Sequence, residues 1–142
     1  MYLHASPLAA VSVCAPGMVN SLDPSRDWFV GVRDVEEKFG QDIDRHGLYG
    51  LPVQVVVGGS DIGHDIMVEP SNPLYMEGVN DAGATRVERS GFLHRALMRA
   101  GVRSQLDIVP GASHQAQDAQ LAVDEFFRKL HEPPSGATAE KT

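Results

Sequence analysis

The sequence of 142 residues has a single cysteine, no long apolar run and no cluster of basic residues. Cys14 has no partner for an internal disulfide, which excludes a disulfide-stapled scaffold. No apolar stretch reaches the roughly 18 residues of a membrane span, and the N-terminus lacks the basic and then apolar layout of a signal peptide. With a net charge of -7, the chain offers no basic stripe to nucleic acid or to an acidic membrane. We therefore expect a cytoplasmic globular protein.

The clearest secondary-structure signal is a β-branched run near the middle of the chain. Residues 53–57 contain four valines, with Pro52 before them and two glycines after them. This pattern is typical of a strand buried on both faces of a parallel sheet. Other apolar runs predict an earlier strand at residues 8–14 and a later one at residues 105–109.

Helical patterns follow the central strand. Thr85 and Glu88 have the spacing of a capping box, and the apolar residues after them recur at helical intervals until Gly101. A second helix is predicted over residues 117–131. Its expected inner stripe consists of Val123, Phe126, Phe127 and Leu130.

The remaining segments are mostly irregular. Residues 18–50 form an irregular, cap-like excursion that contains a short helix at residues 32–39. Residues 62–83 have no sustained period and predict a long loop of the kind that often serves a site. The composition of residues 132–142 favours a disordered tail, which leaves one domain over residues 1–131.

The predicted order is strand, irregular segment, strand, helix, strand, helix. Right-handed crossovers would place the three strands parallel and adjacent, with helices on the faces of the sheet. We therefore predict an α/β fold class: a three-layer, partial doubly wound parallel sheet.

The first predicted strand would be an unprotected edge of this sheet. Residues 8–14 contain neither a charge nor a proline, and natural edges are rarely left so bare. We expect that another strand normally pairs there, and that the isolated chain can associate with itself through this edge.

Two polar residues follow predicted strands. Asp61 comes directly after the central strand and its glycines, and His114 comes after the last strand and a Pro-Gly-Ala-Ser turn. Because parallel strands present their carboxyl ends at one edge, we expect both side chains at that edge, where ligands of open α/β sheets collect.

Five segments carry a family resemblance when they are taken in order. They are Leu-Ala-Ala-Val-Ser-Val-Cys-Ala-Pro-Gly (8–17), Arg-Asp-Trp (26–28), Leu-Pro-Val-Gln-Val-Val-Val-Gly (51–58), Gly-Ala-Thr-Arg-Val-Glu-Arg (83–89) and Val-Pro-Gly-Ala-Ser-His (109–114). They resemble the C-terminal half of α/β-hydrolases, particularly bacterial esterases related to polyhydroxybutyrate depolymerases. The resemblance implies that Asp61 is the acid and His114 the base of a catalytic triad, an order that α/β-hydrolases share. It implies a small-molecule ester substrate, with no metal and no organic cofactor.

The nucleophile of that family sits in a Gly-x-Ser-x-Gly elbow, and this sequence contains no such pentad. Residues 58–63 place Ser60 among glycines with the wrong spacing. Residues 1–4 resemble the last turn of the helix that should follow the elbow. We therefore expect the C-terminal portion of a serine ester hydrolase, which carries the acid and the histidine but is inactive as an isolated chain.

Several other residues are weaker candidates. Asp65 lies on the same loop as Asp61 and could replace it as the acid. Ser60 and Ser113 are each adjacent to a candidate triad residue, and neighbouring side chains diverge, so neither is expected to be the nucleophile. Asp61, His64 and Asp65 could suggest a metal site, but no second histidine lies close by.

Two further residues have open interpretations. Cys14 is expected to be buried within its strand, where burial raises the pKa of a thiol and hides the sulfur. Trp28, with Arg26 and Arg33 near it in sequence, could face a substrate or cover the core.

A different class of function remains open. In this alternative the chain is a non-catalytic α/β module that uses the edge at residues 8–14 for binding or assembly. A dinucleotide-binding domain is disfavoured because no Gly-x-Gly-x-x-Gly follows the first strand.

Overall fold

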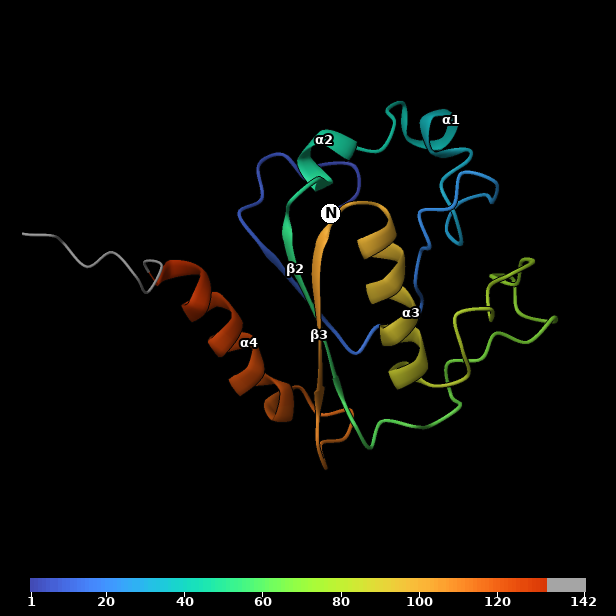
Figure 1. Ribbon diagram of the computed structural model, residues 1–142. Coiled ribbons are helices and arrows are strands. Elements are labelled where there is room, and N and C mark those ends of the chain that lie inside the picture. Colours follow the sequence, from blue (N-terminus) through green and yellow to red (C-terminus); the bar gives the residue numbers. More distant parts are fainter. Residues whose placement is uncertain (133–142) are drawn as a thin grey trace, which may run out of the picture.

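The valine run forms the central strand of a three-stranded parallel sheet in the computed structural model (Figure 1). This structure describes residues 1–132, apart from the side chains of Ala116 and Asp118. Strand β2 (Pro52–Gly58) lies between β1 (Val11–Cys14) and β3 (Arg103–Val109). Every residue of β2 after its first is buried, as predicted for a strand covered on both faces.

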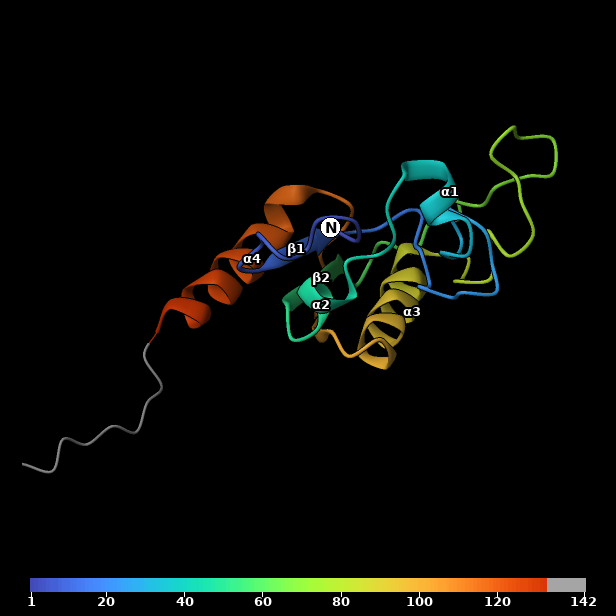
Figure 2. The same ribbon diagram turned by 90° about the horizontal axis from the view of Figure 1, so that it is seen from above.

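The two long helices cover opposite faces of this sheet, as Figure 2 shows. They are α3 (Arg86–Arg99) and α4 (Ala116–His131). The sheet order follows the chain order, and both strand pairs are parallel. The predicted three-layer, partial doubly wound α/β fold is therefore confirmed.

Helix α3 begins and ends as its sequence predicts. The Thr85 hydroxyl accepts a hydrogen bond from the Glu88 amide at 3.2 Å, and the Glu88 carboxylate accepts one from the Thr85 amide at 3.1 Å. Leu93 and Leu97 are buried against the sheet, and Gly101 follows the helix with a φ of 81°. The large hydrophobic core lies on this face and includes Val53, Val55, Leu93, Leu97 and Val102.

The face under α4 is polar at its centre. The Gln54 side chain is fully buried and accepts a hydrogen bond from the Ser12 hydroxyl at 2.7 Å. Its amide nitrogen donates to Asp107 at 2.7 Å and to the Ala122 carbonyl of α4 at 2.9 Å. Because these bonds run from strand to strand and then to the helix, they tie α4 to the middle of the sheet.

The expected inner stripe of α4 is only partly right. Phe126 is buried and Val123 and Phe127 are partly buried, but Leu130 is 39% exposed. Ala119 is the other buried residue of the helix among its described side chains. The described side chains of α4 therefore bury little apolar surface, and the polar Gln54 contacts lie beneath the helix.

The excursion between β1 and β2 contains two short helices, which lie near the amino ends of the strands (Figure 1). Helix α1 (Val35–Phe39) begins later than the predicted residue 32 and ends at Gly40 in a left-handed conformation. Helix α2 (Arg45–Leu48) was not predicted. Asp44 caps it by accepting from the Gly47 amide at 2.9 Å, and the same carboxylate binds Ser6 near the N-terminus.

Strand β1 differs from its prediction in two respects. It begins at Val11, so residues 8–10 are not part of it. Cys14 is exposed, and the prediction of a buried thiol is wrong, because β1 is an edge that pairs only with β2 among residues 1–132. The predicted tail lies outside the described residues, except for Glu132 directly after α4.

Candidate active site

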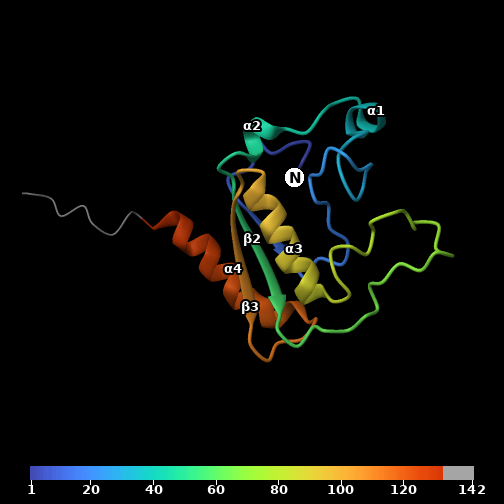
Figure 3. The same ribbon diagram turned by 45° about the vertical axis from the view of Figure 1, so that its right-hand side comes forward.

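Two loops meet at the carboxyl edge of the sheet, as Figure 3 shows where the chain leaves β2 and β3. The amide of Gly59 donates to the Val109 carbonyl at 2.8 Å, and the amide of Ser60 donates to the Ala112 carbonyl at 2.9 Å. A Cβ atom on Gly58 would collide with the Ala112 and Ser113 carbonyls. Glycine at this position therefore lets the two loops approach closely.

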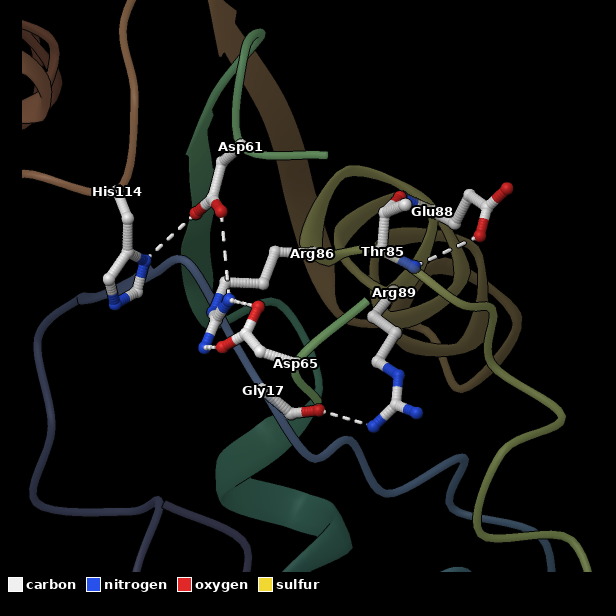
Figure 4. A network of polar contacts seen from close by, with 8 residues as sticks. All are labelled: Gly17, Asp61, Asp65, Thr85, Arg86, Glu88, Arg89 and His114. Atoms are coloured by element: carbon white, nitrogen blue, oxygen red, sulfur yellow. Dashed lines mark hydrogen bonds and ion pairs between the residues drawn. The ribbon is translucent and has the colours of Figure 1, made fainter. Parts of the chain in front are cut away.

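This approach brings the two predicted site residues together. The Nδ1 atom of His114 lies 2.8 Å from Asp61 Oδ2 (Figure 4). The Asp61 side chain is 5% exposed, whereas that of His114 is 60% exposed. An ionised carboxylate can only accept a hydrogen bond, so with Asp61 in that form His114 carries its proton on Nδ1. In the neutral ring, Nε2 then presents a lone pair.

A third charged residue lies against the same carboxylate. Arg86, the first residue of α3, places Nη1 3.6 Å from Asp61 Oδ1. Its guanidinium also binds Asp65 in a bidentate manner, with contacts of 3.0 and 2.9 Å. The hydrogen bond to Arg86 lowers the pKa of Asp65, and the same bond raises the pKa of Arg86. The buried Asp61 carboxylate therefore contacts a cation on one oxygen and an imidazole on the other.

A second arginine fixes the loops around the site. Arg89 is fully buried and donates to the Gly83 carbonyl at 2.8 Å. It donates to the Gly17 carbonyl at 2.5 Å as well (Figure 4). It also donates to the Asn80 side chain at 3.1 Å. Burial lowers the pKa of Arg89, with a further contribution from the neighbouring charge of Arg86. Arg89 thereby joins the end of the long loop to the segment after β1.

The other candidates do not join this arrangement. Asp65 binds Arg86, whereas the histidine contact is made by Asp61. Among the described side chains, which exclude that of Asp118, no three His, Cys, Asp or Glu residues are grouped as metal ligands would be. Trp28 packs partly against the main core and meets Phe39 edge to face, with ring centroids 5.2 Å apart. Trp28 therefore covers the core.

Comparisons with known proteins give no match at the level of sequence families. The chain matches no protein-family model and no curated relative. Among solved structures, it is similar to poly(aspartic acid) hydrolase-1 from Sphingomonas sp. KT-1, with a TM-score of 0.63 and 16% identity over 82% of this chain. It is also similar to LpqC, a poly(3-hydroxybutyrate) depolymerase from Bordetella parapertussis, with a TM-score of 0.66 and 20% identity over 93% of this chain.

The chain therefore shares the α/β fold of part of these two structures. It spans less than half of both solved structures, 44% of the Sphingomonas chain and 45% of the Bordetella chain. Within the described part of the chain, none of the helices has the length and apolar character that crossing a membrane requires.

Arg86 was not predicted as a site residue from the sequence. The residue lies 25 positions from Asp61, and no local pattern joins the two. One signal was available, because a cation in the first turn of a helix is disfavoured by the helix dipole. Such an arginine needs nearby anions, and the structure supplies Asp61 and Asp65.

Proposed function

We propose that this chain carries the acid and the base of a serine ester hydrolase, with Asp61 as the acid and His114 as the base. The observation that carries the proposal is the 2.8 Å contact between His114 Nδ1 and Asp61 Oδ2 at the carboxyl edge of a hydrolase-type sheet. The substrate would be a small molecule with an ester bond, and no metal or organic cofactor takes part.

In the proposed reaction, His114 Nε2 takes the proton of a serine hydroxyl as the serine oxygen attacks the ester carbonyl. The protonated ring then gives that proton to the departing alcohol, which leaves an acyl-serine. Water attacks this acyl group while His114 Nε2 again accepts a proton, and the ring then passes that proton to the serine oxygen as the acid product leaves. Asp61 holds the ring in the required tautomer and stabilises its positive form.

The serine would come from polypeptide outside this sequence, because the sequence has no Gly-x-Ser-x-Gly elbow. In this fold the oxyanion hole uses the amide after the nucleophile and an earlier loop, so it would also lie outside. In another enzyme with a Ser-His-Asp triad, replacing the serine alone lowers the turnover number about 10⁶-fold. We therefore propose that the isolated chain is the C-terminal portion of the enzyme and is inactive by itself.

Three measurements on the purified chain test this proposal. An activated nitrophenyl ester should be hydrolysed no faster than in buffer, and a fluorophosphonate probe should label no serine. Proton NMR should show a downfield Nδ1–H signal from His114, because that proton lies in a hydrogen bond to a carboxylate. The signal is assigned by its loss in His114→Gln.

The matched variants are Asp61→Asn and Asp65→Asn. The Asp61 variant should abolish the downfield signal, and the Asp65 variant should retain it. Stoichiometric serine labelling, or turnover well above buffer, would contradict the proposed inactivity. A downfield signal that survives Asp61→Asn would contradict the proposed pair and would favour the non-catalytic module, for which the exposed edge of β1 is the main structural support.

A further inference from the structure

We propose that a cavity beside α3, separate from the pair of Asp61 and His114, binds a carboxylate that carries a short apolar chain. The cavity has a volume of about 520 Å³, and neither Asp61 nor His114 lines it. It is lined by α3, by the excursion between β1 and β2, and by the end of the long loop before α3. Volumes of about 300–1,000 Å³ are typical of small-molecule sites. The proposal does not depend on the ester hydrolase reaction, because it concerns a different set of residues.

The walls of the cavity are mainly apolar. Phe92 and Ala96 lie one turn apart on α3, so they share one face of the helix, and both line the cavity. Leu22 and Val30 of the excursion also line it. Leu22, Val30 and Ala96 are buried in the protein. These walls favour a ligand with an apolar part, which would leave water on binding.

Two arginines bring positive charge to the cavity at the amino edge of the sheet. Arg45 is the first residue of α2 and Arg99 is the last residue of α3, and both line the cavity. Figure 1 shows that α2 and the end of α3 lie at this same edge. Within the described part of the chain, neither arginine side chain has a hydrogen bond or an ion pair. Asp44, which precedes Arg45, binds Ser6 and Gly47 instead.

The carboxylates that line the cavity already have other partners. Asp81 forms an ion pair with Arg26, with 3.2 Å between its Oδ2 atom and the guanidinium. Asp23 accepts hydrogen bonds from the amide and the hydroxyl of Ser25, at 2.8 and 2.7 Å. Three arginines and two aspartates line the cavity, so its lining is net positive although the chain is acidic overall. The two arginines at the amino edge are therefore available to an anion.

The combination of these features identifies the class of ligand. A guanidinium donates two parallel hydrogen bonds to a carboxylate, which makes arginine well suited to this group. A carboxylate between Arg45 and Arg99 would place its chain against the apolar walls, which include Phe92 and Ala96. An inorganic anion would leave these walls in contact with water, and a neutral alcohol would leave both arginines without an anion.

The test is a titration of the whole chain with hexanoate, followed by backbone amide NMR. Saturable shifts are expected at Phe92, Ala96 and Ala100, which line the cavity, and the downfield signal of His114 should not change. Inorganic phosphate and hexanol are titrated separately, because each carries only one of the two features of the ligand. Both should bind more weakly than hexanoate. Because binding is measured without activity, the result is independent of the proposed function.

Substitutions of single arginines show whether the cavity is the binding site. Arg45→Gln and Arg99→Gln should each raise the Kd of hexanoate about tenfold, since each removes a charged hydrogen-bond donor. Arg95→Gln is the matched control and should leave the Kd unchanged. Arg95 lies one turn before Arg99 on α3 and is exposed, but it does not line the cavity. All three side chains are exposed, so the variants should fold, and urea denaturation checks this.

Four results would overturn the proposal. The first is the absence of saturable shifts with hexanoate in the millimolar range. The second is phosphate binding as tight as that of hexanoate, because the apolar walls would then contribute nothing. The third is a Kd for hexanoate that is unchanged in both Arg45→Gln and Arg99→Gln. The fourth is an equal loss of affinity in Arg95→Gln, which would indicate attraction to positive charge in general.

Discussion

Gly58 allows a sharp test of how the two site loops are held together. The substitution Gly58→Ala adds a Cβ that would collide with two carbonyl oxygens of the histidine loop. Because these are backbone atoms, the loops must separate to accommodate it. Overpacking of this kind costs about 1–3 kcal/mol, and the smaller entropy of the unfolded alanine chain offsets about 0.4–1 kcal/mol. We expect a net loss of roughly 1–2 kcal/mol in the free energy of unfolding.

The adjacent glycine is a matched control. A Cβ on Gly59 would lie 3.3 Å from the Val109 carbonyl oxygen and 3.4 Å from Ile108, a tight but adjustable contact. Gly59→Ala should therefore change the free energy of unfolding by less than about 1 kcal/mol. The two glycines are adjacent, one at the end of β2 and one directly after it, so the substitutions differ chiefly in what the new methyl group meets.

Urea denaturation gives the two free energies, and the downfield signal of His114 reports on the site in the same samples. Gly58→Ala should weaken or broaden this signal, because Asp61 and His114 move apart when their loops separate. Gly59→Ala should preserve it. If Gly58→Ala is as stable as Gly59→Ala and leaves the signal unchanged, the close approach of the loops is not what holds the pair.

Three other perturbations test the core, the polar centre and the N-terminal attachment. Leu97→Ala removes a fully buried side chain and should cost about 2–5 kcal/mol in urea denaturation, whereas Leu121→Ala, at a residue 80% exposed, should change little. Gln54→Leu leaves the Ser12 hydroxyl and the Ala122 carbonyl without their bonds to residue 54 and should cost about 1–3 kcal/mol in the same assay. Hydrogen bonds lower the pKa of Asp44 from 3.8 to about 2, and the bond from the Ser6 hydroxyl contributes most. The ionised Asp44 carboxylate therefore stabilises the folded state fully above about pH 4, and this stabilisation is lost as the pH falls through about 2. The melting temperatures of Asp44→Asn and the wild type should differ most at neutral pH and converge in acid.

The parts of this fold that could be predicted have local patterns. The valine run identifies β2, and Thr85 with Glu88 marks the start of α3, because each signal depends on residues close in sequence. Asp61 and His114 were found because parallel strands deliver their following residues to a common edge. Helix α2 has only four residues and depends on a carboxylate that also binds the N-terminal segment, so no local pattern revealed it.

Other features depend on which strands are neighbours. The exposure of Cys14 follows from the position of β1 at the edge of the described sheet, and its apolar sequence suggested burial. The contact between Arg86 and Asp61 joins the start of a helix to the loop after a strand. The sequence hints at it only because a cation in the first turn of a helix is unfavourable without a nearby anion.

The open edge of β1 has a consequence for the timing of activity. A parallel strand added beside β1 would end at the same edge of the sheet as Asp61 and His114, so the residue after that strand would lie on the same side of the molecule as the pair. Under the proposed function, docking of the missing piece and completion of the reactive centre would be one event. An enzyme composed of two separate polypeptides would then become active only when they associate.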